Sequence, residues 1–247
     1  MKGLITAAGL GTRSGLDGKF RKEMLPVYDA RDNRLVLRPI IDVIITGFYR
    51  NGIDDIAVVL DPSDRWTREY IGTNFPETTI LFQEEKKGYG HAVLMARDFV
   101  GQDDFILNAG DGLVLNEEIL EKMVSAVGKC IFLALMPVPN PENYGCPDLR
   151  MENGEAVITG VVEKSRNPPS KYGLCALYRL PPDIFGEIYS AGSNIELTPA
   201  IDRAIKKGIP THGEIIERKE WISVGKAESY VDVLMATLEK AREKITS

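Results

Sequence analysis

The chain has 247 residues, of which 44% are hydrophobic and 27% charged, and its formal net charge is −6. These values are typical of a soluble enzyme with a substantial core, and the negative charge argues against nucleic-acid binding as the main activity. No run approaches the ~20 apolar residues of a membrane span, and the start, MKGLITAAGLG, lacks the pattern of a signal peptide, so we expect a cytoplasmic protein without a membrane partner.

Short apolar runs alternate with helical patterns through the first 138 residues. We expect buried strands at 2–7, 55–60, 78–83, 104–110 and 130–138, and helices at 39–50, 63–72, 90–100 and 116–127. Alternation of this kind predicts a Rossmann-like α/β fold, in which a mainly parallel central sheet carries helices on both faces.

The pattern becomes richer in strands after residue 140. Strands at 155–164 and 171–180 predict an insert that makes the sheet mixed and forms a wall over its open end. A helix at 197–207, a strand at 211–216 and an amphipathic helix at 226–244 follow. No linker interrupts the chain, so we expect a single domain, 1–247, made of a first half at 1–138, a strand-rich half at 139–225 and a C-terminal helix at 226–247.

The cysteines and histidines do not suggest a disulfide or a zinc site. Cys130, Cys146 and Cys175 are odd in number and lie mostly in apolar, strand-like runs, which predicts buried free thiols. The only histidines are His91 and His212, too few for a histidine-based zinc site.

A glycine-containing segment, AAGLGTRSG, follows the first strand directly. Gly9 and Gly11 allow the backbone to approach a ligand closely, so that successive N–H groups can point at phosphate oxygens. Arg13 and Lys22 flank the segment that follows, and two cations placed in this way suit a triphosphate.

Two common phosphate-binding motifs do not fit this segment. A Walker loop requires Ser or Thr after Gly-Lys, where this chain has Phe20. A dinucleotide-binding fingerprint requires a third glycine that opens a helix, but the chain has Ser14 and no helical pattern there.

Further side chains of suitable chemistry follow along the chain. Asp111 ends a predicted strand at the carboxyl edge of the sheet, where a carboxylate facing phosphates is a candidate magnesium ligand. Gln83 offers both a donor and an acceptor to a base edge, and Gly88 leaves room for the base. Glu163 could accept hydrogen bonds from sugar hydroxyls, while Lys164 could hold a sugar phosphate.

These motifs together resemble the sugar-1-phosphate nucleotidyltransferases (NDP-sugar pyrophosphorylases), among them the glucose-1-phosphate uridylyl- and thymidylyltransferases. The resemblance is carried, in chain order, by LITAAGLGTRSG, RKEMLPV, QEEKKGYGHAV, LNAGD, ENYG, VVEK, ELTPAIDRAIKKG and WISVGKAESY. It implies a GT-A-like nucleotidyltransferase fold, with nucleotide bound by 1–138 and sugar phosphate by the insert-containing half, 139–225.

The resemblance also implies an activity. An NTP, with UTP or dTTP favoured, reacts with a sugar-1-phosphate to give an NDP-sugar and pyrophosphate, with Mg²⁺ as cofactor. The partners would be these small-molecule substrates, with no nucleic acid; a homo-oligomer is compatible with the family.

Site residues are carried over from the family motifs position by position. The implied catalytic residues are Arg13, Lys22, Asp111 and Lys164; the nucleotide-binding residues are Ala7, Ala8, Gly9, Leu10, Gly11, Thr12, Gln83 and Gly88; the sugar-phosphate-binding residues are Tyr144, Gly145, Glu163 and Lys164.

One position departs from the family pattern. Where the family places a second metal-binding aspartate, this chain has Ser223, so the implied metal ligands are Asp111 and a neutral hydroxyl. Three outcomes are open. In the first, Asp111, water and substrate phosphates suffice for magnesium. In the second, another carboxylate substitutes in space. In the third, the chain is a degenerate or regulatory homologue that binds an NTP or NDP-sugar without turnover.

Overall fold

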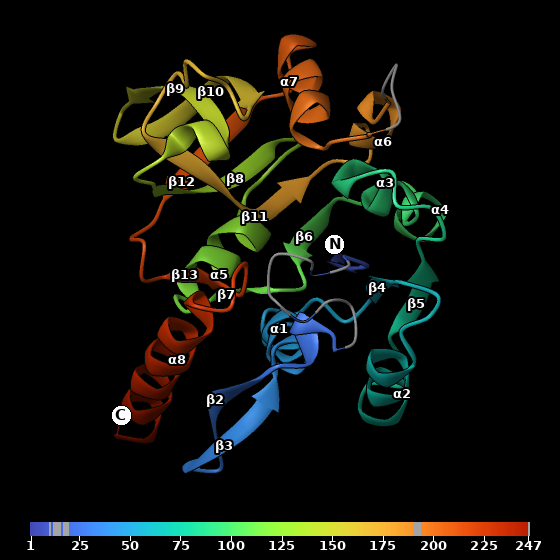
Figure 1. Ribbon diagram of the computed structural model, residues 1–247. Helices are drawn as coiled ribbons and strands as arrows, with labels where there is room; N and C mark the ends of the chain where they lie inside the picture. Colours follow the sequence, from blue (N-terminus) through green and yellow to red (C-terminus); the bar gives the residue numbers. More distant parts are fainter. Residues whose placement is uncertain (10, 12–15, 17–19, 190–193, 247) are drawn as a thin grey trace.

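A computed structural model describes residues 1–9, 11, 16, 20–189 and 194–246 (Figure 1). Its centre is a nine-stranded sheet with the order β5-β4-β1-β6-β11-β8-β12-β10-β9. The strands of this sheet are β1 (Lys2–Ala7), β4 (Ile56–Leu60), β5 (Thr79–Phe82), β6 (Phe105–Ala109), β8 (Ile131–Pro137), β9 (Gly145–Glu152), β10 (Glu155–Glu163), β11 (Tyr172–Leu180) and β12 (Thr211–Ile215).

Two small sheets and a set of helices complete the described fold. A hairpin pairs β2 (Pro26–Arg31) with β3 (Arg34–Pro39), and β7 (Gly112–Val114) pairs with β13 (Trp221–Ser223). The helices are α1 (Ile40–Arg50), α2 (Arg65–Asn74), α3 (Tyr89–Leu94), α4 (Arg97–Val100), α5 (Glu118–Ser125), α6 (Ile184–Glu187), α7 (Thr198–Lys206) and α8 (Ser229–Thr246), with 3₁₀ turns at Lys22–Met24 and Pro141–Asn143.

The expected mixed, mainly parallel sheet is confirmed. Strands β5, β4, β1, β6, β8, β12 and β9 run in one direction, and β11 and β10 run in the other. The insert strands β9 and β10 continue the same sheet at its edge (Figure 1). The division into halves at residues 138 and 225 stays a prediction.

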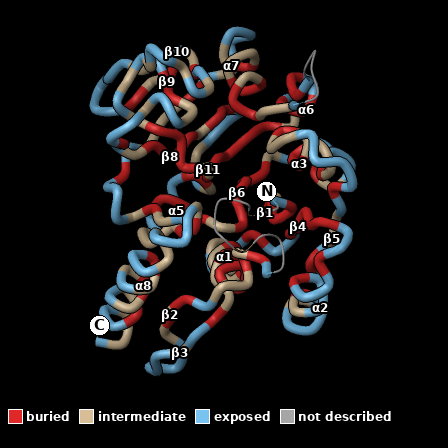
Figure 2. Tube along the Cα trace, viewed as in Figure 1, coloured by how far each residue is buried: buried red, intermediate tan, exposed pale blue. Residues whose placement is uncertain are grey.

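Apolar side chains cover both faces of the sheet, as the continuous apolar strands predict. One core cluster joins the sheet to α3, α4, α6 and α7, and a second joins the opposite face to α1, α2, α5 and α8. Neighbouring residues of β1 show the alternation, because Leu4 belongs to the first cluster and Ile5 to the second. Figure 2 shows the resulting pattern, with buried strands and helices whose outer surfaces are exposed.

Several elements differ from the expectation for local reasons. The helix expected at 90–100 is two short helices, because the amides of Met95 and Ala96 bond to carbonyls three residues back. Helix α5 begins later than expected, and the side chain of Asn116 accepts from the amide of Glu118 in its first turn.

The β2–β3 hairpin and α8 project together from the body of the molecule (Figure 1). The hairpin turns at Asp32 and Asn33, whose φ angles of 50° and 56° fit the two-residue turn that Asn and Asp tolerate. At its base, the buried Arg38 contacts Asp29 and Asp42 and donates to Oγ1 of Thr46 at 2.6 Å. This network joins the hairpin to α1.

All three cysteines are free and buried, as expected. Burial raises the pKa of the Cys175 thiol. Among the helices of the described residues, none is long and apolar enough to cross a bilayer.

Candidate functional site

Four neighbouring strands end at one edge of the sheet. The register pairs Ala7 with Leu60, Leu60 with Phe82, and Thr6 with Ala109, so β1, β4, β5 and β6 finish side by side. The residues that follow these strand ends are Ala8 and Gly9, Asp61, Gln83, and Gly110 and Asp111. This carboxyl edge is where open α/β sheets bind ligands.

Lys22 and Asp111 meet at this edge. The 3₁₀ turn Lys22–Met24 places the Lys22 ammonium against Oδ2 of Asp111, and both side chains remain partly accessible. The carbonyl of Asp111 accepts from the amide of Val224 at 3.1 Å, which fixes its backbone against β13. Two of the predicted catalytic residues, 89 positions apart in the chain, are therefore adjacent.

The turn that carries Asp111 crosses β1 closely. The amide of Gly110 donates to the carbonyl of Thr6 at 2.8 Å. A Cβ atom at position 110 would lie 2.9 Å from Cβ of Ala7, closer than real side chains pack. Glycine at this position therefore lets Asp111 sit over the end of β1.

Ser223 lies beside the Asp111 turn. It pairs with Gly112 across β7 and β13 and is exposed. Trp221, at the other end of β13, packs under Gly112, where a Cβ atom would come within 2.3 Å of the indole ring. The structure thus places the serine next to Asp111, where the family pattern places a second aspartate.

This donor set fits magnesium held mainly by substrate. Within residues 1–9, 11, 16, 20–189 and 194–246, no group of three or more His, Cys, Asp or Glu side chains could hold a metal. Mg²⁺ usually keeps several waters and is bound through one or two carboxylates together with substrate phosphates. One carboxylate with a neighbouring hydroxyl meets that requirement.

Gln83 is buried and held in a defined orientation. Its amide nitrogen Nε2 donates to the carbonyl of Gly88 at 3.0 Å and lies 3.2 Å from Nδ1 of His91. Its backbone amide donates to the carbonyl of Leu60 at 2.9 Å. Because a carbonyl can only accept, the contact with Gly88 assigns the nitrogen to that side and leaves Oε1 as the atom that can accept from a ligand.

Gly88 lies against residues 194 and 195, which are far from it in the chain. Its φ of 104° suits glycine, and a Cβ atom there would lie 2.3 Å from Oδ1 of Asn194. Ile195 donates to the carbonyl of Lys87 at 2.6 Å and accepts from the amide of Gly90 at 2.8 Å. Residues 194–196 therefore pack directly on the segment that holds Gln83.

The four predicted sugar-phosphate residues are brought together. Gly145 pairs with Glu163 across β9 and β10, and the amide of Lys164 donates to the carbonyl of Tyr144 at 3.0 Å. One carboxylate oxygen of Glu163 accepts from Thr198 at 2.6 Å, and the other lies 3.0 Å from the Lys164 ammonium. The lysine side chain is 60% exposed and can reach a ligand.

Two tyrosines have raised pKa values. Burial raises the pKa of Tyr89, and the negative charge of Asp111 contributes to the same effect. Burial also raises the pKa of Tyr178, with a contribution from Glu163.

Part of the predicted nucleotide segment can be placed. Ala7 and Ala8 are buried at the end of β1, Gly9 is exposed, and Gly11 has a φ of 64°. Leu10, Thr12 and Arg13 lie outside the described residues, so their predicted roles stay predictions.

Sequence reasoning missed several charged residues near the strand ends. Arg21 and Glu23, the neighbours of Lys22 in the chain, are both buried. Burial raises the pKa of Glu23 to about 8, and the charge of Lys22 opposes this rise. Asp61 and Lys86, which contact each other, come from other loops. The signal that could have identified Arg21 and Glu23 was their position on either side of Lys22 in the chain. No motif near Asp61 or Lys86 in the sequence marks them.

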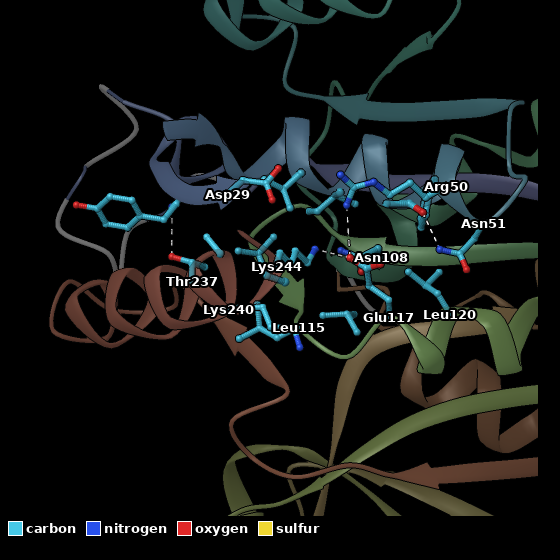
Figure 3. Close-up of a pocket in the computed structure, with 18 residues that line it drawn as sticks. Asp29, Arg50, Asn51, Asn108, Leu115, Glu117, Leu120, Thr237, Lys240 and Lys244 are labelled. Atoms are coloured by element: carbon cyan, nitrogen blue, oxygen red, sulfur yellow. Dashed lines mark hydrogen bonds and ion pairs between the residues drawn. The ribbon is translucent and has the colours of Figure 1, made fainter. Parts of the chain in front are cut away.

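A separate pocket lies between α1, α5, β7 and α8 (Figure 3). Arg50 from α1 and Lys244 from α8 both reach Oε1 of Glu117, at 3.4 and 2.5 Å. Burial of Glu117 favours its neutral form, but the hydrogen bond from Lys244 and the positive charges of Lys244, Arg50 and Lys240 together outweigh it and lower its pKa. The described residues that line this pocket include none of the predicted site residues, so the pocket is distinct from the candidate site.

Comparisons with known proteins find similar sequences. The low-salt glycan biosynthesis nucleotidyltransferase of Haloferax volcanii is 27% identical over 251 residues, which cover 97% of this chain and 66% of that protein. UTP–glucose-1-phosphate uridylyltransferase 2 of Streptococcus pyogenes is 28% identical, over 81% of this chain and 78% of that protein.

The fold also matches solved structures. The crystal structure of a UDP-glucose pyrophosphorylase complexed with UDP-glucose has a TM-score of 0.82 and 24% identity, and the match covers 97% of this chain and 98% of that chain. The sequence model of one protein family, described as nucleotidyl transferase, matches residues 2–240. The chain therefore belongs to the nucleotidyl transferase family of enzymes.

Proposed function

We propose that this protein transfers a nucleotidyl group from UTP or dTTP to a sugar-1-phosphate and releases pyrophosphate. The observation that carries the proposal is the meeting of Lys22 and Asp111 at the carboxyl edge of the sheet. A cation and a candidate metal ligand are thereby placed beside the glycine segment after β1. The UDP-glucose-related relatives support the sugar-nucleotide class.

The proposed reaction needs charge neutralisation more than acid–base chemistry. A phosphate oxygen of the sugar-1-phosphate attacks the α-phosphorus, and the bond to the pyrophosphate oxygen breaks. The nucleophile is already anionic, so no general base is required. Lys22 would neutralise charge at the α-phosphate, Lys164 would align the sugar phosphate, and Arg13 would stabilise the leaving pyrophosphate.

Magnesium would be held by Asp111, with the hydroxyl of Ser223 and the phosphates of both substrates available as further ligands. When bound, the ion supplies positive charge between the phosphates. Lys22 would then be drawn from Asp111 towards the α-phosphate.

The preference for uracil or thymine over cytosine and adenine rests on the orientation of Gln83. Its Nε2 is directed to the Gly88 carbonyl, so Oε1 is the group that it offers to a base. Uracil and thymine carry an imide N–H that can donate to this oxygen, whereas the ring nitrogens at the matching edge of cytosine and adenine are acceptors.

A substrate panel tests the proposal. The full chain is incubated with Mg²⁺, each of UTP, dTTP, CTP, ATP and GTP, and a set of sugar-1-phosphates, and pyrophosphate release is measured. We expect release with UTP or dTTP and much less with CTP or ATP. Release with CTP above UTP and dTTP would contradict the base assignment. UTP binding by calorimetry without release from any pair would identify a binding protein instead of an enzyme.

Replacing Gln83 by Glu tests whether the contact with Gly88 orients this side chain for the base. The new carboxylate cannot donate to the Gly88 carbonyl, and two acceptor oxygens would then face each other. We therefore expect the KM for UTP to rise by roughly tenfold, with a smaller change in kcat. The matched control is Gln102→Glu, since Gln102 is the only other glutamine and is exposed. Equal KM values for the two variants would contradict the assignment.

Ser223→Asp tests how magnesium is held. A second carboxylate beside Asp111 should lower the Mg²⁺ concentration for half-maximal rate by roughly tenfold, a change of the size seen when groups around metal sites are altered. At saturating Mg²⁺ we expect kcat to stay within about twofold, because Asp111 and the phosphates already suffice. The exposed Ser125 provides the control variant, Ser125→Asp. A kcat gain of a hundredfold would show that the natural site is degenerate.

A further inference from the structure

A chain of charged contacts crosses the ends of β1, β4 and β5. On the β1 side, Nη1 of Arg21 donates to the carbonyl of Gly9 at 3.2 Å, and Nη2 lies 3.5 Å from Oδ1 of Asp61. On the β5 side, Nζ of Lys86 lies 2.7 Å from Oδ2 of Asp61 and donates to the carbonyl of Gln83 at 3.1 Å. The two cations bind different oxygens of one carboxylate.

Asp61 is built into this position. Its side chain is 11% exposed, and Oδ1 also accepts from the amide and the hydroxyl of Ser63, at 2.8 and 2.5 Å. Burial favours the neutral form of Asp61, but hydrogen bonds from Lys86 and Ser63 outweigh it and hold the pKa well below its usual range. The carboxylate is thus a fixed negative charge at neutral pH.

Arg21 is equally constrained. Its side chain is 9% exposed, and besides Asp61 it contacts Oγ of Ser63 at 3.4 Å and Oδ2 of Asp64 at 3.6 Å. Oδ1 of Asp64 accepts from the amide of Thr67 and caps α2. The guanidinium that holds the Gly9 carbonyl is therefore itself held by the start of a helix.

We propose that Asp61 is a positioning residue that fixes the distance between the base-reading Gln83 and the phosphate-binding glycine segment, through Lys86 on one side and Arg21 on the other. This inference rests on the proposed function, because it assigns Gln83 to the base and Gly9 to the phosphates. It adds residues 21, 61 and 86, which do not touch the substrate, to the working parts of the site.

The physical reason is the span of a nucleotide. Its base and its triphosphate must bind at once to two loops that belong to different strands. A small misplacement of either loop weakens binding and moves the α-phosphate from its line of attack. Supporting contacts of this kind normally fix such loops.

A double-mutant cycle separates this role from a general structural one. The dissociation constant of UTP, with Mg²⁺, is measured by calorimetry for the full chain and for Arg21→Met, Lys86→Met and their combination. The four measurements are repeated with Asp61→Asn in each protein. Thermal midpoints are recorded for all eight.

We expect each single variant to weaken UTP binding roughly tenfold, and the combination to be little weaker than either one, because each break interrupts the same chain of contacts. In proteins that already carry Asp61→Asn, adding Arg21→Met or Lys86→Met should change the dissociation constant of UTP by less than about twofold. In kinetics, the KM for UTP should rise, while the KM for the sugar-1-phosphate changes by less than about twofold. A general loss of stability would not raise the KM for UTP while leaving the KM for the sugar-1-phosphate nearly unchanged.

Independent effects in the combination, about a hundredfold in total, would overturn the inference, and so would an Asp61→Asn protein that binds UTP like the parent. If the parent binds neither UTP nor dTTP, the proposed base assignment fails, and the inference fails with it. That outcome is distinct from binding by the parent without coupling.

One comparison remains decisive if the variants at the buried residues 21 or 61 do not fold. Lys86 is 31% exposed, and its neighbour Lys87 is 46% exposed and pairs with Glu85. Lys86→Met should weaken UTP binding roughly tenfold, whereas Lys87→Met should leave it within about twofold. Equal affinities of these two variants would overturn the inference.

Discussion

Lys22→Met is expected to lower kcat about 10²- to 10³-fold, equivalent to about 2.7–4 kcal/mol of barrier. The reason is that no other group at the described edge of the sheet is placed to put a positive charge against Asp111 and the incoming phosphates in the same way. The KM for the NTP should change far less, since the charge acts mainly in the transition state. Steady-state pyrophosphate release with the preferred substrate pair measures both constants.

Two further proteins make this result interpretable. Lys219→Met removes a lysine that is 79% exposed and should leave kcat unchanged. The double variant Lys22→Met/Asp111→Asn removes both charges of the pair, so it should recover any stability lost by leaving Asp111 unpaired, yet remain inactive. A kcat for Lys22→Met within tenfold of the parent would contradict the catalytic role.

Arg38→Met is expected to lower the free energy of unfolding by about 3–5 kcal/mol, because it leaves Asp29 buried without its guanidinium partner and Asp42 with only the more distant Arg31, at 3.5 Å. For a chain of this size each kcal/mol shifts the thermal midpoint by about 2–4 °C, so the loss should exceed about 6 °C. Urea unfolding followed by circular dichroism measures it. Tyr70 also donates to Asp42 at 2.5 Å, so the damage should reach α2.

The comparison variant is Arg50→Met. Arg50 is 43% exposed and pairs with Glu117, and exposed ion pairs of this type contribute about 0–1 kcal/mol. Replacing Asp29 and Asp42 by Asn in the Arg38→Met background should return part of the lost stability, since it removes the uncompensated charges. Similar losses for Arg38→Met and Arg50→Met would show that the buried network does not carry the hairpin.

The strands of the central sheet could be predicted wherever they are buried on both faces. Residues 2–7, 56–60 and 105–109 are mostly apolar runs, which leave a clear signal in the sequence. Strand β9 left none, because it lies at the edge of the sheet, contains Pro147 and exposes most of its second half. Strand β13 has only three residues and is defined by its partner β7.

The grouping of predicted site residues could be anticipated where sheet geometry dictates it. Asp111 and Gln83 follow strands, so their arrival at one edge is a consequence of parallel pairing. For Lys22 and Glu163, the prediction came from the family motifs instead of from sheet geometry. Ser223 pairs with Gly112, the residue after Asp111. The position at which the chain departs from the family pattern therefore lies beside Asp111 in space.

The contacts around Asp61 could not have been read from the sequence. Arg21, Asp61 and Lys86 are separated by 40 and 25 residues, and each is an ordinary surface residue by type. Only the packing of three loops decides that Arg21 and Asp61 are buried and that Arg21 and Lys86 share the Asp61 carboxylate. Charged residues in loops carry no periodicity, so a pattern search has nothing to detect.

The place of β11 between β6 and β8 has a consequence for biosynthesis. During translation, β6 is complete when residue 109 has left the ribosome. The strand that covers its free edge, β11, is complete only when residue 180 has emerged. At ordinary elongation rates this interval lasts several seconds, roughly 4–14 s. An uncovered strand edge can pair with neighbouring nascent chains. Good yields should therefore depend on uninterrupted translation through residues 110–180, and a stall there should favour inclusion bodies.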